Sequence, residues 1–146
     1  MMTLETLKTK EALRKLIDDY AYLGDEWKIS EVMDLFTPDL IYKVYMGGSL
    51  VATTSGRETM EKEFNGHASQ VKTYFTLNGQ HTVIIEGETA SGISYSQIKM
   101  IREVEGKDIL TDYSVKYDDQ YIFQDGKWYI KERVAHFLII ESRTLS

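Results

Sequence analysis

The stretch FTLNGQHTVIIEGETASGISY, residues Phe75–Tyr95, decides how the second half of the chain folds. It contains two places where a β-hairpin can turn. Asn78–Gly79 is the stronger hairpin signal by residue type, and Glu86–Gly87 is the weaker one. A turn at Asn78–Gly79 would make His81 an ordinary residue beside a turn. A turn at Glu86–Gly87 would place a polar cluster that includes His81 midway along a long strand.

The lengths of the neighbouring strands favour the turn at Glu86–Gly87. After Gln70 the chain has long β-like runs, separated by short breaks rich in turn-forming residues. These runs are Val71–Glu86, Thr89–Val104, Ile109–Phe123 and Lys127–Glu141. With this turn, the strands on either side of it match the later ones in length. Gly79 then marks a bulge or bend in a long, curved strand.

The first part of the chain has a helical pattern instead. Thr3 is a suitable N-cap, and apolar residues at helical spacing follow it as far as Gly24, a suitable helix end. The other expected elements are a short helix from Ile29 to Phe36 ended by Pro38, strands at Leu40–Met46 and Leu50–Thr54, and a third helix at Arg57–Phe64. Three helices before a curved antiparallel sheet predict an α+β fold with helices on one side of the sheet, and these two layers can enclose a pocket.

Composition sets the class of protein and excludes several kinds of site. The 146 residues suit one domain, residues 1–146, with one core. Absence of Cys excludes disulfides and thiolate metal sites, and three widely spaced His residues form no metal-ligand pattern, so we expect no metal and no cofactor. The net charge of −6 gives no reason to expect nucleic-acid binding. Because no run is apolar enough to span a membrane or to form a signal peptide, we expect a cytoplasmic protein.

Four segments resemble the SnoaL-like branch of the nuclear transport factor 2-like superfamily. They are YLGDEWKISEVMDLFTPDLIY, SGRETMEKEF, NGQHTVIIEGETASGISY and YDDQYIFQDGKWYIKERVAHF. The resemblance extends from about Leu4 to Arg143 and implies a cone, in which a curved sheet wraps on helices around a deep apolar cavity. The superfamily includes cyclases, dehydratases, isomerases, oxygenase small subunits and pure binding proteins. Function therefore has to be argued from the pocket residues.

Two residues are the candidates for catalysis. Asp25 follows the first helix and matches the acidic position that the resembling enzymes carry at the cavity mouth, where a carboxylate can act as base or acid. The alternative is a solvated aspartate at a helix end. His81 could shuttle a proton beside such a carboxylate, or it could only be hydrogen-bonded within the sheet. The dehydratase-like pattern has a histidine earlier in this strand, where Thr76 stands here.

Several other residues are candidates for the pocket wall. Tyr22, Tyr42, Tyr95 and Tyr117 suit a wall that is apolar with polar tips, although core packing explains any one of them equally well. Asn78 and Thr76 could orient a ligand, or Asn78 could stabilise the bend. Asp119 could be a second pocket acid, or it could pair with Arg133 and only join strands. His67 is expected in a loop after the third helix, where it could contact a ligand at the cavity rim or be solvated, and His136 is expected in solvent as well.

These residues favour a cofactor-independent enzyme that acts by proton transfer on a small hydrophobic carbonyl compound, by isomerisation, dehydration or cyclisation. The alternative is a non-catalytic protein that binds a small molecule in the same cavity. A small subunit of a larger oxygenase fits less well, since nothing in the sequence indicates a large docking partner.

Apolar residues on both faces of the strands predict a homodimer through the sheet. Val83 and Ile84 are adjacent, so they face opposite sides of the strand. The helices cannot cover both sides, so a second subunit is expected on the outer one. Ile98 and Met100 are expected on that outward face.

Overall fold

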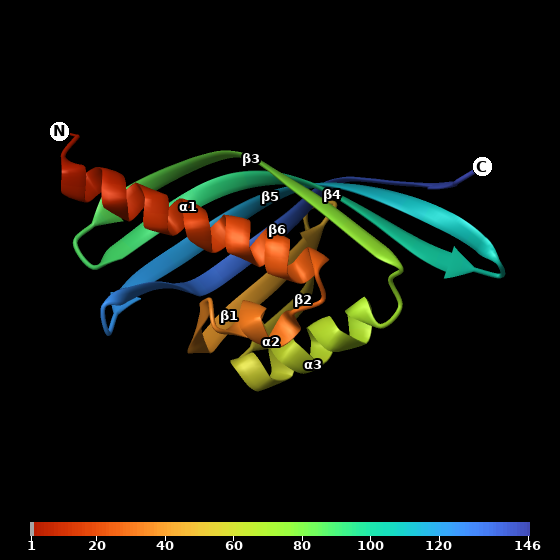
Figure 1. Ribbon diagram of the computed structural model, residues 1–146, viewed down its shortest axis with the longest axis horizontal. Coiled ribbons are helices and arrows are strands. Elements are labelled where there is room, and N and C mark those ends of the chain that lie inside the picture. The colour runs from red at the N-terminus through yellow and green to blue at the C-terminus, as the bar shows by residue number, and fades with distance from the viewer. Residues whose placement is uncertain (1) are drawn as a thin grey trace.

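The computed structural model describes residues 2–146, and it consists of three helices and a strongly curved six-stranded sheet (Figure 1). In chain order the elements are α1 (Leu4–Asp25), α2 (Ile29–Met33), β1 (Phe36–Met46), β2 (Ser49–Ser55), α3 (Arg57–Ala68), β3 (Thr73–Glu86), β4 (Thr89–Val104), β5 (Lys107–Gln124) and β6 (Lys127–Thr144). The strand order is β2-β1-β6-β5-β4-β3, and only the β1–β6 pair is parallel. The predicted α+β cone fold is confirmed.

Helix α1 lies along the concave side of the sheet, next to the edge strand β3 (Figure 1). Thr3 caps it by accepting a hydrogen bond from the backbone N–H of Thr6 at 3.1 Å. Its inner side buries Leu13, Leu16 and Ile17, and each such side chain contributes about 1.5–3 kcal/mol of transfer free energy. The helix therefore serves as one wall of the cone.

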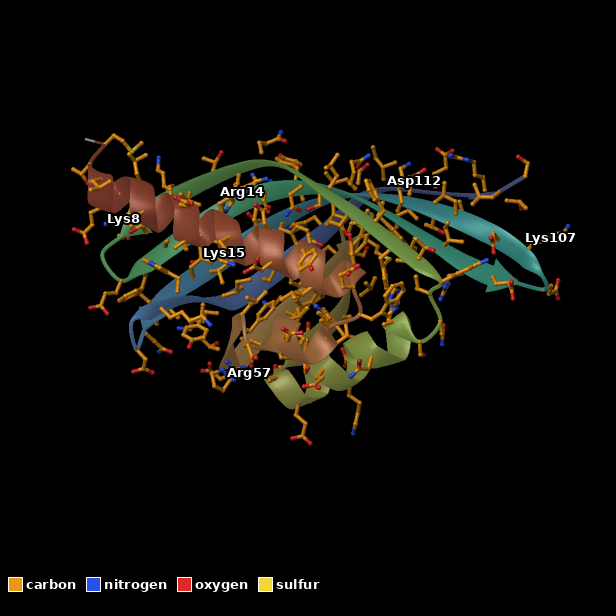
Figure 2. The ribbon with its side chains drawn as sticks, viewed as in Figure 1. Lys8, Arg14, Lys15, Arg57, Lys107 and Asp112 are labelled. Atoms are coloured by element: carbon orange, nitrogen blue, oxygen red, sulfur yellow. The ribbon has the colours of Figure 1, made fainter. Side chains whose placement is uncertain are left out.

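The β3–β4 hairpin confirms the turn expected at its tip. Glu86 pairs with Thr89, so the chain reverses between them. The register between the two strands shifts between Asn78 and His81, which is the bulge predicted at Gly79. Arg14 of α1 reaches this bulge and donates a hydrogen bond from Nη1 to the Gly79 carbonyl at 2.8 Å (Figure 2).

Two boundaries in the first half of the chain differ from the prediction. The second helix ends at Met33, and Phe36 and Pro38 belong to β1. Pro38 is tolerated there because the pairing of β1 with β6 is interrupted between Phe36 and Ile41, so its missing N–H leaves no gap in the ladder.

The third helix is longer than predicted. It continues through Gly66 to Ala68, four residues past Phe64. Contacts made far away in sequence hold this last turn. Trp27 donates from its indole Nε1 to the Ala68 carbonyl at 3.4 Å. His67 is therefore a helical residue and not a loop residue.

Side chains on the two sides of the sheet differ in their exposure to solvent. Val83 packs against the core on the concave side, whereas its neighbour Ile84 is 62% exposed on the convex side. Ile98 and Met100 line the cavity on the concave side, so the prediction that they face outward was wrong. When both alternating sets of a strand are apolar, alternation separates the two sets but does not show which one faces the core.

Candidate functional site

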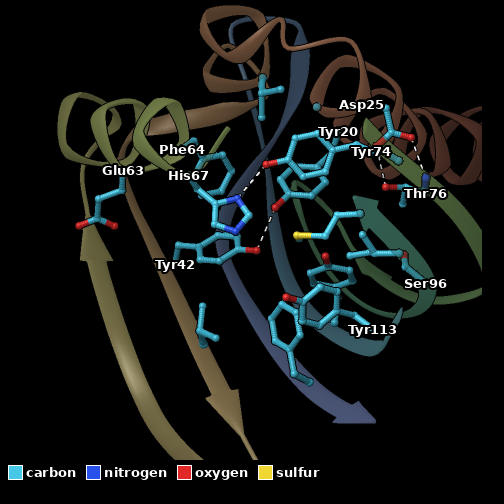
Figure 3. A pocket seen from close by; sticks show the side chains of 18 of the residues that line it. Tyr20, Asp25, Tyr42, Glu63, Phe64, His67, Tyr74, Thr76, Ser96 and Tyr113 are labelled. Carbon is cyan, nitrogen blue, oxygen red and sulfur yellow. Dashed lines mark hydrogen bonds between the residues drawn. The ribbon is translucent and has the colours of Figure 1, made fainter. Parts of the chain in front are cut away.

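The concave side of the sheet and the helices enclose a cavity of about 360 Å³ (Figure 3). This is within the size range of small-molecule sites, which runs from about 300 to 1,000 Å³. Most of the wall is apolar or aromatic. The polar side chains in it include Tyr20, Asp25, Tyr42, Thr54, Glu63, His67, Tyr74, Thr76, Asn78, Ser96, Tyr113 and Tyr117.

Asp25, the last residue of α1, contributes a carboxylate to the cavity wall. Thr76 holds this carboxylate with two hydrogen bonds, from its backbone N–H to Oδ2 and from its hydroxyl to Oδ1, both at 2.7 Å. A carboxylate has about four acceptor positions, so two of them stay free for a ligand. Asp25 is thus fixed in orientation and still able to accept a proton. Thr76 therefore holds the acid in place.

Three polar residues on the inward side of β3 face the cavity and make hydrogen bonds to other elements. Tyr74, Thr76 and Asn78 alternate along the strand and all line the cavity. Asn78 donates from Nδ2 to the Ile17 carbonyl at 3.0 Å and accepts from the Ser96 hydroxyl. Asn78 therefore ties α1 to the sheet next to the bulge, in addition to facing the cavity.

His67 is the residue that sequence reasoning placed wrongly. It reaches from α3 to the mouth of the cavity, and its Nδ1 lies 2.7 Å from the Tyr74 hydroxyl (Figure 3). Part of the ring is open to solvent. Partial burial and the nearby Arg102 lower the pKa of His67 below its ordinary value, so the ring is neutral at pH 7. The sequence around Asn65 and Gly66 indicated a loop, and only the structure shows that the helix continues to Ala68.

Tyrosine hydroxyls supply the other polar groups of the cavity. Tyr20 and Tyr42 are hydrogen-bonded to each other through their hydroxyls at 2.9 Å. Burial raises the pKa of both, so both stay protonated; one hydroxyl donates to the other, and the second keeps its O–H for a further acceptor. Behind the wall, the Arg133 guanidinium lies 4.2 Å from the ring centre of Tyr20 and 3.6 Å from that of Tyr117.

His81 lies outside this cavity, in a second polar cluster beneath α1. Its Nε2 is 3.0 Å from the Tyr121 hydroxyl, which donates to Asp119 Oδ2 at 2.9 Å. Asp119 Oδ1 in turn lies 3.3 Å from Nε of Arg133, and both charged side chains are almost fully buried. Gly92 leaves the space for this arrangement, since a Cβ there would lie 2.9 Å from the Tyr121 ring and 3.1 Å from His81 Nε2.

The predicted wall residues therefore fall into two groups. Tyr42, Thr76, Asn78 and Tyr117 line the cavity, as Asp25 does. Tyr22 is 58% exposed and Tyr95 is 37% exposed, and neither lines the cavity. Asp119 belongs to the buried ion pair, which is the alternative that the sequence left open. His136, expected in solvent, is partly exposed, stacks on Tyr45 and lies 3.2 Å from Asp118.

Two other kinds of site were searched for in the described part of the chain. Within residues 2–146, no three His, Cys, Asp or Glu side chains are grouped closely enough to hold a metal ion. None of the helices described here is long and apolar enough to cross a membrane.

Solved structures of the same fold cover nearly the whole chain. A provisionally assigned scytalone dehydratase from Novosphingobium aromaticivorans is 20% identical, with a TM-score of 0.83 over 99% of this chain and 94% of that one. The hexachlorocyclohexane dehydrochlorinase LinA-type3 from Novosphingobium barchaimii is 16% identical, with a TM-score of 0.80 over 98% and 94%. At these identities the likeness shows the fold alone.

The family itself is shown by sequence. No curated protein matches the chain at a significant level. The family model described as the SnoaL-like domain matches residues 5–134, which is most of the chain. The chain therefore belongs to the SnoaL-like family, within the nuclear transport factor 2-like fold.

Proposed function

We propose that this protein is a cofactor-independent enzyme that moves a proton on a small, hydrophobic, carbonyl-bearing compound bound in the cone cavity. The observation that carries this proposal is the carboxylate of Asp25, held at a fixed orientation by Thr76 in an otherwise largely aromatic wall. The solved dehydratase and dehydrochlorinase structures of the same fold support cofactor-independent catalysis of this general kind.

Asp25 is the base in this proposal. It takes a proton from a carbon next to the carbonyl group, and the electrons of that C–H bond move toward the carbonyl oxygen. A base fixed near the reacting carbon gains from orientation as well as from basicity. His81 has no part in this step, because its ring lies outside the cavity and is engaged with Tyr121.

The Tyr20–Tyr42 hydroxyl pair binds an oxygen of the ligand deeper in the cavity. One O–H of this pair is used between the two tyrosines, and the other can donate to an acceptor oxygen of the ligand. The carboxylates of Asp25 and Glu63 in the wall disfavour an anionic ligand. The substrate class that fits is a neutral, largely apolar molecule with oxygen acceptors.

The alternative is a binding protein that uses the same cavity without catalysis. Thr76 favours this alternative, because it stands where the dehydratase-like pattern has a histidine. The two hypotheses differ in what Asp25 does. In a binding protein it only accepts a hydrogen bond, and replacement by asparagine would then alter affinity without altering any rate.

A ring-opening probe tests the proposal. In 5-nitrobenzisoxazole, a base removes the proton from carbon, the C–H electrons form a nitrile, the N–O bond breaks and the oxygen leaves as a coloured phenolate. We expect Asp25→Asn to lower the rate at least tenfold while the unfolding midpoint stays unchanged, since general acid–base groups contribute roughly 10²–10⁴-fold. Asp34→Asn is the matched control, because Asp34 lies outside the cavity wall. Equal rates for wild type and Asp25→Asn would contradict the proposal.

A homodimer through the convex side of the sheet is the assembly that we propose. Phe75, Leu77, Ile84 and Ile139 are each more than half exposed, and they lie on β3 and β6. Leu77 and Ile139 lie in one row across the sheet with Gln97 and Ser114 between them, and a second copy of the chain would cover the exposed apolar side chains at both ends of that row. Light scattering should give about twice the chain mass of 16.9 kDa. Leu77→Glu should dissociate the dimer, because Leu77 faces outward, whereas Ile98 faces the cavity and does not suit this test. A mass of one chain for wild type at all concentrations would contradict the dimer.

A further inference from the structure

We infer that His67 is a catalytic residue of the cavity, whose Nε2–H donates a hydrogen bond to the ligand oxygen on which negative charge develops. This inference rests on the proposed function. In this inference Asp25 is the base and His67 is the group that stabilises the developing negative charge. His67 belongs to α3, across the cavity mouth from Thr76 on β3.

The first observation is how the ring is held. Tyr74 is the only side chain of residues 2–146 within hydrogen-bond distance of His67, at 2.7 Å from Nδ1. Partial burial raises the pKa of Tyr74 to about 12, so its hydroxyl keeps its proton. A phenol is a far stronger acid than a neutral imidazole N–H, so the phenol donates and Nδ1 accepts. The ring proton of neutral His67 is then on Nε2.

The second observation is the relation between His67 and Asp25. The residues that hold them, Tyr74 and Thr76, are two positions apart on the same side of β3. Their Cα atoms are therefore roughly 7 Å apart along the strand. A carbonyl compound of a few atoms spans such a distance. The carbon that loses its proton meets the base, and the oxygen of the neighbouring carbonyl group meets the imidazole N–H.

The third observation is the packing that keeps Tyr74 in place. The ring of Trp27 lies against Tyr74, with a centroid separation of 5.8 Å, and the Trp27 indole N–H is bonded to the Ala68 carbonyl. Trp27 thus joins the strand that carries Tyr74 to the helix turn that carries His67. This contact fixes both partners of the hydrogen bond relative to each other.

The chemistry balances without any further reactant. Asp25 takes the proton, the C–H electrons form a new double bond, and the carbonyl π electrons become a lone pair on oxygen. His67 donates a hydrogen bond to that oxygen and keeps its proton. A neutral imidazole suits this role because its N–H can strengthen the bond as charge develops. The oxygen held by His67 lies at the reacting end, while the Tyr20–Tyr42 pair holds a second oxygen, so the predicted substrate carries oxygen at both ends.

Kinetics with 5-nitrobenzisoxazole test this role, because its leaving phenolate oxygen takes the place of the developing oxyanion. His67→Phe should lower kcat about tenfold or more with little change in KM, and His67→Gln, which keeps a side-chain N–H, should recover part of it. His136→Phe is the matched control, since that ring stacks on Tyr45 and does not line the cavity. An unchanged kcat in His67→Phe, with Asp25→Asn still impaired, overturns the inference alone. Unchanged rates in both variants overturn the proposed function as well.

Nitrogen NMR of the imidazole gives a readout that does not depend on turnover. Wild type should show the Nε2–H tautomer of His67, and Tyr74→Phe should show a mixture of both tautomers, because the phenol that accounts for the preference is gone. This change follows from the hydrogen bond itself, so the measurement tests the Nε2–H tautomer that the role requires, and the kinetics test the role. The Nδ1–H tautomer in wild type would overturn the inference.

Discussion

The molecule contains two histidine–tyrosine pairs on the concave side of one sheet, and their surroundings differ completely. His67 and Tyr74 lie at the mouth of the cavity, and within residues 2–146 the Tyr74 hydroxyl has no other side-chain hydrogen-bond partner. His81 and Tyr121 lie beneath α1, where Tyr121 already donates to Asp119. The same residue types therefore form an open site in one region and a buried cluster in the other, where Oδ1 of Asp119 and Nε and Nη1 of Arg133 have no hydrogen-bond partner within residues 2–146. Residue type alone does not distinguish a functional pair from a structural one.

The largest expected loss of stability comes from a substitution in the buried cluster around His81. Asp119→Ala leaves the buried guanidinium of Arg133 without its counter-ion, and loss of one partner of a buried pair costs about 3–5 kcal/mol. Urea unfolding measures the free energy of unfolding. The adjacent Asp118→Ala is the control, because its pair with His136 is partly exposed and such pairs contribute only about 0–1 kcal/mol. Equal losses in the two variants would show that burial of the pair is not what matters.

A smaller loss of stability is expected when a side chain fills the space above Gly92. Gly92→Ala places a Cβ about 3 Å from both Tyr121 and His81, and overpacking of this kind costs about 1–3 kcal/mol. Gly66→Ala is the matched control. Its Cβ would meet nothing within 4 Å, and replacing a helical glycine by alanine stabilises by up to about 1 kcal/mol. Thermal unfolding should therefore move in opposite directions, and two shifts of the same sign would contradict the packing of the cluster.

The smallest expected effect is a dependence of stability on pH. Burial, with help from Arg14 and Arg133, lowers the pKa of His81 to about 4 in the folded state, against 6.5 when unfolded; only Asp18 opposes this. The folded chain therefore disfavours the charged ring. The contribution of neutral His81 to the free energy of unfolding is therefore complete above pH 6.5 and is lost as the pH falls toward 4. His81→Gln should make the fall in unfolding free energy across that window shallower, and an identical fall in both proteins would contradict it.

Local turn chemistry made much of the fold predictable. The turn at Glu86–Gly87 followed from the strand lengths, although residue type favoured Asn78–Gly79, and the helical spacing after Thr3 located α1. The position of Asp25 at the end of that helix followed from the same pattern. These features depend on neighbours in sequence, which is why they could be read without a structure.

The remaining parts of the site depend on contacts between distant residues. The last turn of α3 is held by Trp27, which is 41 positions away from Ala68, so the sequence around Gly66 indicated a loop. Ile98 and Met100 face the cavity while their neighbours Gln97 and Lys99 face solvent, and the apolar residues Ile93 and Ile101 on the outer set obscured this alternation. The closed state of the His81 cluster depends on Gly92 and Asp119 from two other strands.

A crystal structure with bound 4-nitrophenol tests the central distinction between the open and the closed region most directly. We expect the ring among the aromatic side chains of the cavity, with its hydroxyl oxygen about 2.7–3.2 Å from His67 Nε2 or from the Tyr20–Tyr42 pair. The cluster around His81 should be unchanged. A phenol bound against His81 and Tyr121, or an empty cavity at saturating 4-nitrophenol, would contradict this account of the molecule.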